Sequence, residues 1–173
     1  MLKKILPGLA AILAALLLAV AINTLRQGSR QIDVPPVQPL AFDENAAAQR
    51  LAAAVRLRTI SFDGQSAASA AEFRKLHALL KKSFPRAHAA LKRETVNELS
   101  LLYAWPGSDP AAKPIMLMAH QDVVPIASGT ERDWQVDPFA GEIRDGFVWG
   151  RGAWDNKANL FAIFEAIETL AAS

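Results

Sequence analysis

The sequence predicts an α/β fold in which an open, mainly parallel sheet is flanked by helices and preceded by an N-terminal membrane helix. Residues 115–118, Ile-Met-Leu-Met, form a short, bulky apolar run of the kind that fills a buried parallel strand. Residues 159–172 place apolar side chains at helical spacing, which predicts an amphipathic helix. Residues 5–22 carry no charge and are mostly apolar, which predicts the membrane helix.

Two further helices and one hairpin are expected within the folded part of the chain. Residues 46–57 are rich in alanine and favour a helix. Residues 72–84 alternate basic and apolar side chains at helical spacing, the usual pattern of a surface helix with one solvated face. Residues 142–150 carry Asp145-Gly146, a favoured two-residue turn, between apolar-rich flanks. This last segment is therefore predicted to be a β-hairpin.

The N-terminal apolar stretch has two interpretations. Residues 5–22 follow Lys3 and Lys4, and their 18 residues lie near the lower limit for a helix that crosses a bilayer. Residues 19–21, Ala-Val-Ala, offer a cleavage site and so favour a signal peptide. The stretch exceeds the usual apolar length of signal peptides and Arg26 follows it closely, which favours an uncleaved single-pass anchor. Either interpretation places the rest of the chain on the extracytoplasmic side, anchored to the membrane or exported after cleavage.

Beyond this stretch the sequence divides into a linker and one domain. Residues 23–42 are predicted to be a proline-rich, semi-rigid linker, and residues 43–173 are long enough for one hydrophobic core. The first 30 residues hold four of the 19 Lys and Arg and none of the 17 Asp and Glu, so the remainder carries a net charge of −2. The basic character therefore belongs to the membrane flank, and no nucleic-acid partner is expected.

Several classes of chemistry are disfavoured by residue type. The chain has no cysteine, which excludes disulfides, thiolate ligands and a cysteine nucleophile. Ser61 and Ser128 lack the Gly-x-Ser-x-Gly surroundings of a serine hydrolase. His77 and His88 have no carboxylates at ligand spacing and are not expected to bind metal.

His120 and Asp122 are the first candidate site residues. They follow the predicted strand 115–118, and catalytic groups in open α/β sheets gather at the carboxyl ends of strands. Residues two apart on an extended backbone point the same way, so the two side chains can share a face. A neutral imidazole is a good zinc ligand, and its second ring N–H usually donates to a carboxylate that fixes the tautomer. We expect Asp122 to accept that hydrogen bond.

Asp155 is the third candidate and lies just ahead of the helix predicted over 159–172. Taken alone, this position favours an N-cap, in which the carboxylate accepts from free backbone N–H groups. The alternative is a metal ligand delivered by the turn at Gly150-Arg151-Gly152, a segment too short to form a phosphate-binding loop.

The complete string of motifs resembles the dizinc metallopeptidase family that includes carboxypeptidase S and the aminoacylases. The resemblance covers about residues 43–173, and its elements keep the order and spacing of the family. They are His120-Gln121-Asp122-Val123-Val124-Pro125, Trp134, Pro138-Phe139, Asp145-Gly146, Gly150-Arg151-Gly152 and Asp155-Asn156-Lys157. The resemblance implies that residues 43–173 are the amino-terminal part of a zinc-exopeptidase-like catalytic domain.

The resemblance also implies roles for the three candidates. His120 would bind one of two zinc ions, Asp155 would bridge both, and Asp122 would be the catalytic residue that orients His120 and raises its basicity. The implied reaction is hydrolysis of an amide bond in a peptide or an N-acyl amino acid. Asn156 stands where the family often has an acidic residue or Met, a mild departure because no ligand is expected there.

The family pattern continues with elements that this sequence does not contain. They are a Glu-Glu pair that supplies the general base and a zinc ligand, a further carboxylate, a late histidine, and a lid domain through which homodimers form. No Glu-Glu dipeptide occurs in the chain, and Glu165 and Glu168 are expected to be solvated. Two ligands do not complete a zinc site. The 173 residues alone are therefore expected to be inactive, either as the first part of a longer enzyme or as a truncated, membrane-tethered fragment that acts at most as a binding partner.

Overall fold

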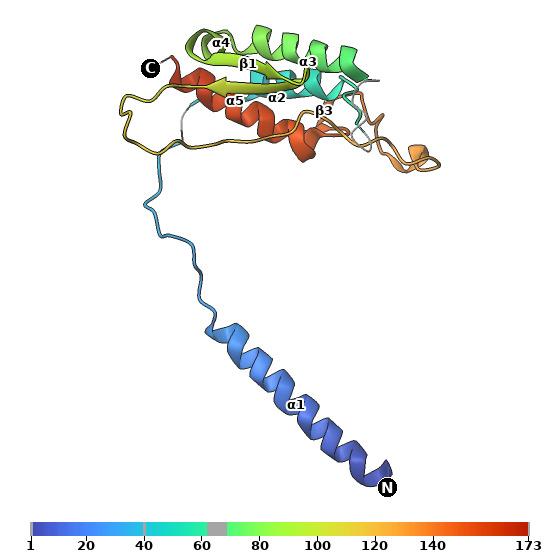
Figure 1. Ribbon diagram of the computed structural model, residues 1–173. Helices are drawn as coiled ribbons and strands as arrows, with labels where there is room; N and C mark the ends of the chain where they lie inside the picture. The colour runs from blue at the N-terminus through green and yellow to red at the C-terminus, as the bar shows by residue number, and fades with distance from the viewer. Residues whose placement is uncertain (1, 40, 62–68, 173) are drawn as a thin grey trace. The chain divides into compact units, whose positions relative to one another are not determined.

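The computed structural model describes residues 2–39, 41–61 and 69–172, and it divides into two compact units, Met1–Leu40 and Ala41–Ser173. The first unit consists of helix α1 (Leu2–Arg26) and an irregular segment that follows it (Figure 1). Within α1, Leu6–Arg26 is long and apolar enough to cross a membrane, and its side chains are exposed. A signal sequence near an N-terminus has the same character, so the helix is compatible with both interpretations of this segment.

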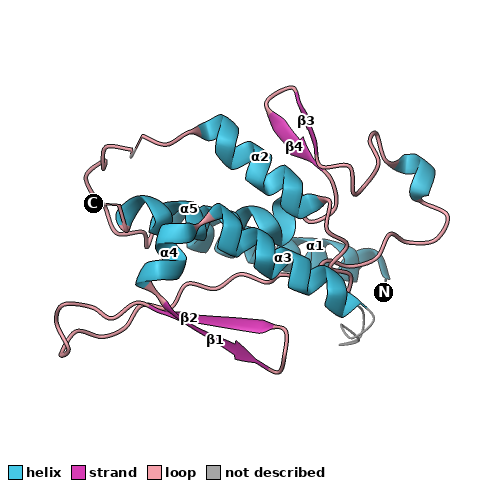
Figure 2. Cartoon of the chain, turned by 90° about the horizontal axis from the view of Figure 1, so that it is seen from above, coloured by secondary structure: helices cyan, strands magenta, loops and turns pink. Residues whose placement is uncertain are grey.

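The described residues of the second unit form four α-helices and two antiparallel hairpins (Figure 2). The elements are α2 (Glu44–Val55), α3 (Ala70–Ser83), α4 (Pro85–Ala90), β1 (Lys92–Val96), β2 (Ser100–Ala104), a 3-10 turn (Glu131–Asp133), β3 (Glu142–Arg144), β4 (Phe147–Trp149), a π-type turn (Ala153–Ala158) and α5 (Asn159–Leu170). The helices are packed against one another, with α2 contacting α3 and α5, and α4 contacting α3 and α5. One hairpin, β1–β2, lies against α4, and the other, β3–β4, lies against α2.

The core lies between α3, α4 and α5 and centres on aromatic rings. Phe84, at the junction of α3 and α4, is fully buried and contacts Phe161 and Phe164 of α5 at centroid distances of 5.6 and 5.2 Å. Leu76 and Leu80 complete the apolar face of α3 and are also fully buried. The helical periodicity of both segments is therefore confirmed, and the predicted hairpin over 142–150 is present as β3–β4.

The predicted strand over 115–118 is wrong for the described chain. This segment has no strand assignment, and its four side chains are 64 to 88% exposed. The one parallel pairing among the described residues is a single bridge between Ile60 and Val123. A strand forms only where a neighbouring strand accepts its backbone hydrogen bonds, and no described residue does so for 115–118. The mixed α and β composition is confirmed, but the described residues form no mainly parallel sheet.

The expectation that Glu165 and Glu168 are solvated is also wrong. Glu165 binds the Arg50 guanidinium of α2 through both oxygens, at 2.6 and 2.7 Å. Glu168 accepts the backbone N–H groups of Arg86 and Ala87 at the start of α4, at 3.1 and 2.8 Å. Both carboxylates therefore fasten α5 to neighbouring helices, and neither lies at the candidate site.

Candidate metal centre

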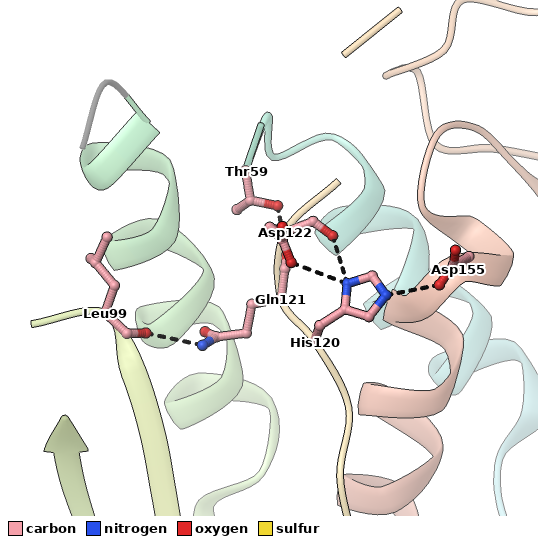
Figure 3. Close-up of polar contacts among 6 residues, drawn as sticks. All are labelled: Thr59, Leu99, His120, Gln121, Asp122 and Asp155. Atoms are coloured by element: carbon pink, nitrogen blue, oxygen red, sulfur yellow. Dashed lines mark hydrogen bonds and ion pairs between the residues drawn. The ribbon is translucent and has the colours of Figure 1, made fainter. Parts of the chain in front are cut away.

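His120 and Asp122 lie on a short extended segment held beside the chain after α2. The backbone N–H of Val123 donates to the backbone carbonyl of Thr59 at 2.9 Å, and the backbone N–H of Ser61 donates to the carbonyl of Val123 at 3.0 Å. The Nδ1 of His120 lies 3.0 Å from the backbone oxygen of Asp122 and 3.1 Å from its carboxylate (Figure 3). The expected contact between the two side chains is therefore present.

Asp155 reaches the same imidazole from the opposite side (Figure 3). Its Oδ1 lies 2.8 Å from His120 Nε2, although 35 residues separate the two in sequence. The residue at the N-cap position of α5 is Ala158, so Asp155 is not the N-cap of that helix. The N-cap interpretation of Asp155 is wrong, and its carboxylate is free to act with His120.

Gly152 explains how the turn before Asp155 approaches the His120 segment so closely. Its φ of +81° is the left-handed conformation that glycine adopts readily. A Cβ at this position would lie 2.4 Å from the Val123 side chain. A side chain would therefore push the turn that carries Asp155 away from the segment that carries His120.

The two carboxylates determine the charge of the imidazole. Burial lowers the pKa of His120, but the hydrogen bond to Asp155, the backbone of Asp122 and the two negative charges outweigh that effect, and the pKa is raised. The side chain is about half exposed, at 49%. Without a metal, protonation of His120 therefore compensates part of the negative charge of the two carboxylates. A bound cation would compensate the same two carboxylates.

A pocket of about 300 Å³ opens beside this cluster. Its walls include Trp134, Arg151 and Trp154 together with the three candidate residues. The Arg151 guanidinium lies over the Trp134 ring, 5.0 Å from its centroid. The pocket therefore combines flat apolar walls with one cation, next to the imidazole.

Lys157 fixes the turn that carries Asp155. Its side chain is fully buried, and its Nζ donates to the carbonyl oxygens of Ala54 at 2.9 Å and Leu57 at 2.7 Å. Ala54 lies in the last turn of α2 and Leu57 just beyond the helix end, where a cation is favoured. Burial lowers the pKa of Lys157 to about 8, and the charge of Glu72 opposes this only in part. The sequence motif contains Lys157, but nothing in the sequence identifies α2 as its partner.

The donors present are suited to zinc but do not complete a site. Ligand atoms of one tetrahedral zinc ion lie roughly 3.3 Å apart when each is about 2.0 Å from the metal, and His120 Nε2 and Asp155 Oδ1 are 2.8 Å apart. A shift of a few tenths of an ångström would therefore admit the ion. Among the described residues, no group of three or more His, Cys, Asp or Glu side chains could hold a metal. The described chain thus offers part of a ligand set.

Comparison with known proteins identifies the family. Residues 116–173, which include all three candidates, match the peptidase family M20/M25/M40. The chain belongs to this metallopeptidase family of hydrolases, as the resemblance in its motifs predicted.

Its relatives include carboxypeptidases and acyl-amino acid hydrolases. Carboxypeptidase S of Saccharomyces cerevisiae is 47% identical over 133 residues, which cover 73% of this chain and 23% of that protein. A probable carboxypeptidase S-like protein of Dictyostelium discoideum is 38% identical over 92% of this chain and 32% of its own length. The N-fatty-acyl-amino acid synthase/hydrolase PM20D1 of Mus musculus is 40% identical over 76% of this chain and 26% of its own length. The chain spans about a quarter to a third of these relatives.

Proposed function

We propose that residues 43–173 contribute His120, Asp122 and Asp155 to the active site of a zinc-dependent hydrolase that cleaves an amide bond in a peptide or an N-acyl amino acid. The observation that carries this proposal is the imidazole of His120 held between Asp122 and Asp155, beside a pocket of about 300 Å³. The relatives named as carboxypeptidases and as an acyl-amino acid hydrolase support the substrate class.

In this proposal each residue has one task. Asp122 accepts the Nδ1–H of His120, which fixes the tautomer and leaves the Nε2 lone pair facing Asp155. His120 and Asp155 would then hold the metal as ligands on one side of the site. When bound, two zinc ions supply a Lewis acid that polarises the scissile carbonyl and acidifies water. The indole walls of the pocket accommodate the apolar part of the substrate.

We further propose that residues 1–22 are a membrane anchor and that residues 23–42 are a linker to the catalytic part. The exposed apolar helix supports membrane contact through residues 5–22, with the folded unit on the extracytoplasmic side. A signal peptide removed on export is the alternative, and it predicts a mature protein without α1. Mass spectrometry of the protein isolated from membranes distinguishes the two.

A second candidate function is that of a non-catalytic, membrane-tethered binding partner. It is favoured by the absence, within the described ranges, of three acidic or histidine side chains that could close around one ion. Catalytic zinc normally needs three protein ligands and an open position. The two candidates differ in whether these residues support hydrolysis once the rest of a family site is supplied.

A chimera tests the proposal directly. The 133 matched residues of Saccharomyces cerevisiae carboxypeptidase S are replaced by those of this chain, and hydrolysis of peptides and N-acyl amino acids is measured. We expect the chimera to be active. Asp122→Asn should lower turnover by about 10- to 100-fold while zinc remains bound, because the tautomer of His120 is no longer fixed.

The matched control is Asp133→Asn, an exposed aspartate in the loop that follows the site. It should leave turnover unchanged. A chimera that folds, as judged by circular dichroism, but hydrolyses neither substrate class would support the non-catalytic alternative. Equal turnover in the Asp122→Asn and control variants would contradict the role of Asp122.

A further inference from the structure

The side chain of Gln121 points away from the candidate metal centre. Gln121 lies between His120 and Asp122, and on an extended backbone neighbouring side chains point to opposite sides. His120 faces Asp155, whereas Gln121 faces the turn that carries Leu99 (Figure 3). Each hydrogen-bonding group of its amide has a protein partner. Oε1 lies 2.8 Å from His77 Nε2, and Nε2 donates to the Leu99 carbonyl at 3.0 Å.

His77 presents a well-defined donor to this amide. It lies on α3, and its side chain is 9% exposed. Burial lowers the pKa of His77, and the hydrogen bond to Gln121 opposes that effect only in part. The ring is therefore neutral near pH 7, and because Gln121 Oε1 only accepts, the proton lies on Nε2. Leu99 lies in the turn between β1 and β2, so the amide joins the site segment to two separate elements.

The backbone of the same residue is held from a third direction. The hydroxyl of Thr59 donates to the Gln121 carbonyl at 2.7 Å, and Thr59 is fully buried. The carbonyl of Thr59 also accepts the N–H of Val123 at 2.9 Å. Gln121 is thus fixed at its backbone and at both ends of its amide, although the segment before it, 115–118, belongs to no strand.

We propose that Gln121 is a positioning residue that holds the His120 imidazole against Asp155. The inference rests on the proposed function, because it gives His120 and Asp155 a shared metal to bind. Because Thr59 holds the carbonyl of Gln121 while His77 and Leu99 hold its amide, rotation of this backbone would break hydrogen bonds, and the neighbouring imidazole keeps its direction. A methionine of similar length would fill the space, but it would break both hydrogen bonds of the amide, so that of the contacts to this residue named above the bond from Thr59 alone would remain.

The test uses the full chain in detergent micelles and the variants Gln121→Met and Gln135→Met. Gln135 is an exposed glutamine in the following loop and serves as the matched control. Co²⁺ binding is followed by visible absorption at a temperature where circular dichroism shows every variant folded. We expect Gln121→Met to weaken Co²⁺ binding by about tenfold, because losing a group that orients a metal ligand costs at least about that much. The control should bind Co²⁺ as the wild type does.

A second measurement needs no metal. Nuclear Overhauser contacts between the His120 ring and the Asp155 methylene should be present in the wild type and in the control, and absent in Gln121→Met. A residue that only stabilised the fold would lower the melting temperature and leave these contacts in place. Gln121→Glu retains an acceptor for His77 but places a charged oxygen against the Leu99 carbonyl in place of the donor, so a loss of the Overhauser contacts is expected there too if Gln121→Met does not fold.

Co²⁺ binding and the Overhauser contacts together distinguish a failure of the proposed function from a failure of the positioning role of Gln121. If the wild type and His120→Ala bind Co²⁺ equally, the proposed function fails, and the Overhauser contacts alone decide the role of Gln121. If the wild type binds Co²⁺ through His120 but Gln121→Met retains both the affinity and the contacts, the positioning role is overturned while the proposed function stands.

Discussion

Replacing His120 with alanine is expected to lower the affinity of the full chain for Zn²⁺ by more than about 100-fold. The loss of a group that merely orients a ligand typically costs 10- to 100-fold, and His120 is itself the proposed ligand. Its Nε2 is the one nitrogen donor beside Asp155 among the described contacts. The affinity is measured by competition with a chromophoric chelator.

The matched control for this prediction is Asp133→Ala, which removes an exposed acid that does not line the pocket. It should bind Zn²⁺ as the wild type does. The raised pKa of His120 adds a pH dependence, because a proton on Nε2 competes with the metal. Zinc affinity should fall as the pH is lowered through that raised pKa. Equal affinities in His120→Ala and the wild type would remove His120 from the site.

Replacing Lys157 with methionine should destabilise the folded unit by about 2–4 kcal/mol. The substitution removes the hydrogen bonds that the charged amine donates to the carbonyls of Ala54 and Leu57, and a hydrogen bond to a charged group contributes about 1.5–3 kcal/mol. The free energy of unfolding is measured by urea titration. Lys75→Met is the control, because Lys75 is exposed and its ion pair with Glu72 contributes about 0.5 kcal/mol. A similar small loss in both variants would show that Lys157 does not anchor the turn.

The same lysine predicts how stability changes with pH. Its pKa is about 8 in the folded chain and about 10.4 in an unfolded one. Between these values the unfolded state binds more protons, so the contribution of Lys157 to stability rises from about pH 8 to pH 10. The wild type should therefore gain stability in this window relative to Lys157→Met. Parallel pH profiles for the two proteins would mean that burial does not lower the pKa of Lys157.

The sequence predicted correctly those elements that depend on residues close to one another in the chain. The helical spacing of residues 159–172 corresponds to α5, and Asp145-Gly146 forms the turn of β3–β4. The approach of His120 to Asp155 was predicted from the resemblance of the motifs, because spacing alone favoured an N-cap for Asp155. Helical period and turn chemistry do not depend on distant partners, and this is why they could be read from the sequence.

Other features depend on which distant residues meet. The apolar run 115–118 has the composition of a strand, but no described segment pairs with it. Glu165 lies outside the apolar stripe of its helix, and the periodicity therefore predicts that its side chain is exposed to solvent. In the structure the side chain binds the guanidinium of Arg50. The anchors Gln121 and Lys157 belong to the recognised motifs, but the partners of the Gln121 amide lie 22 and 44 residues away and those of Lys157 lie 100 and 103 residues away. Such pairings are fixed by tertiary packing, and a single sequence contains no periodic signal for them.

The central claim, that His120 and Asp155 bind the same metal, is tested most directly by X-ray absorption at the zinc edge. The full chain is loaded with one equivalent of Zn²⁺, and the spectra of the wild type, His120→Ala and Asp155→Ala are compared. We predict nitrogen and oxygen ligands at about 2.0–2.1 Å, with imidazole scattering that disappears in His120→Ala and a carboxylate ligand lost in Asp155→Ala. Imidazole scattering that persists in His120→Ala would place the metal on another histidine and contradict the account.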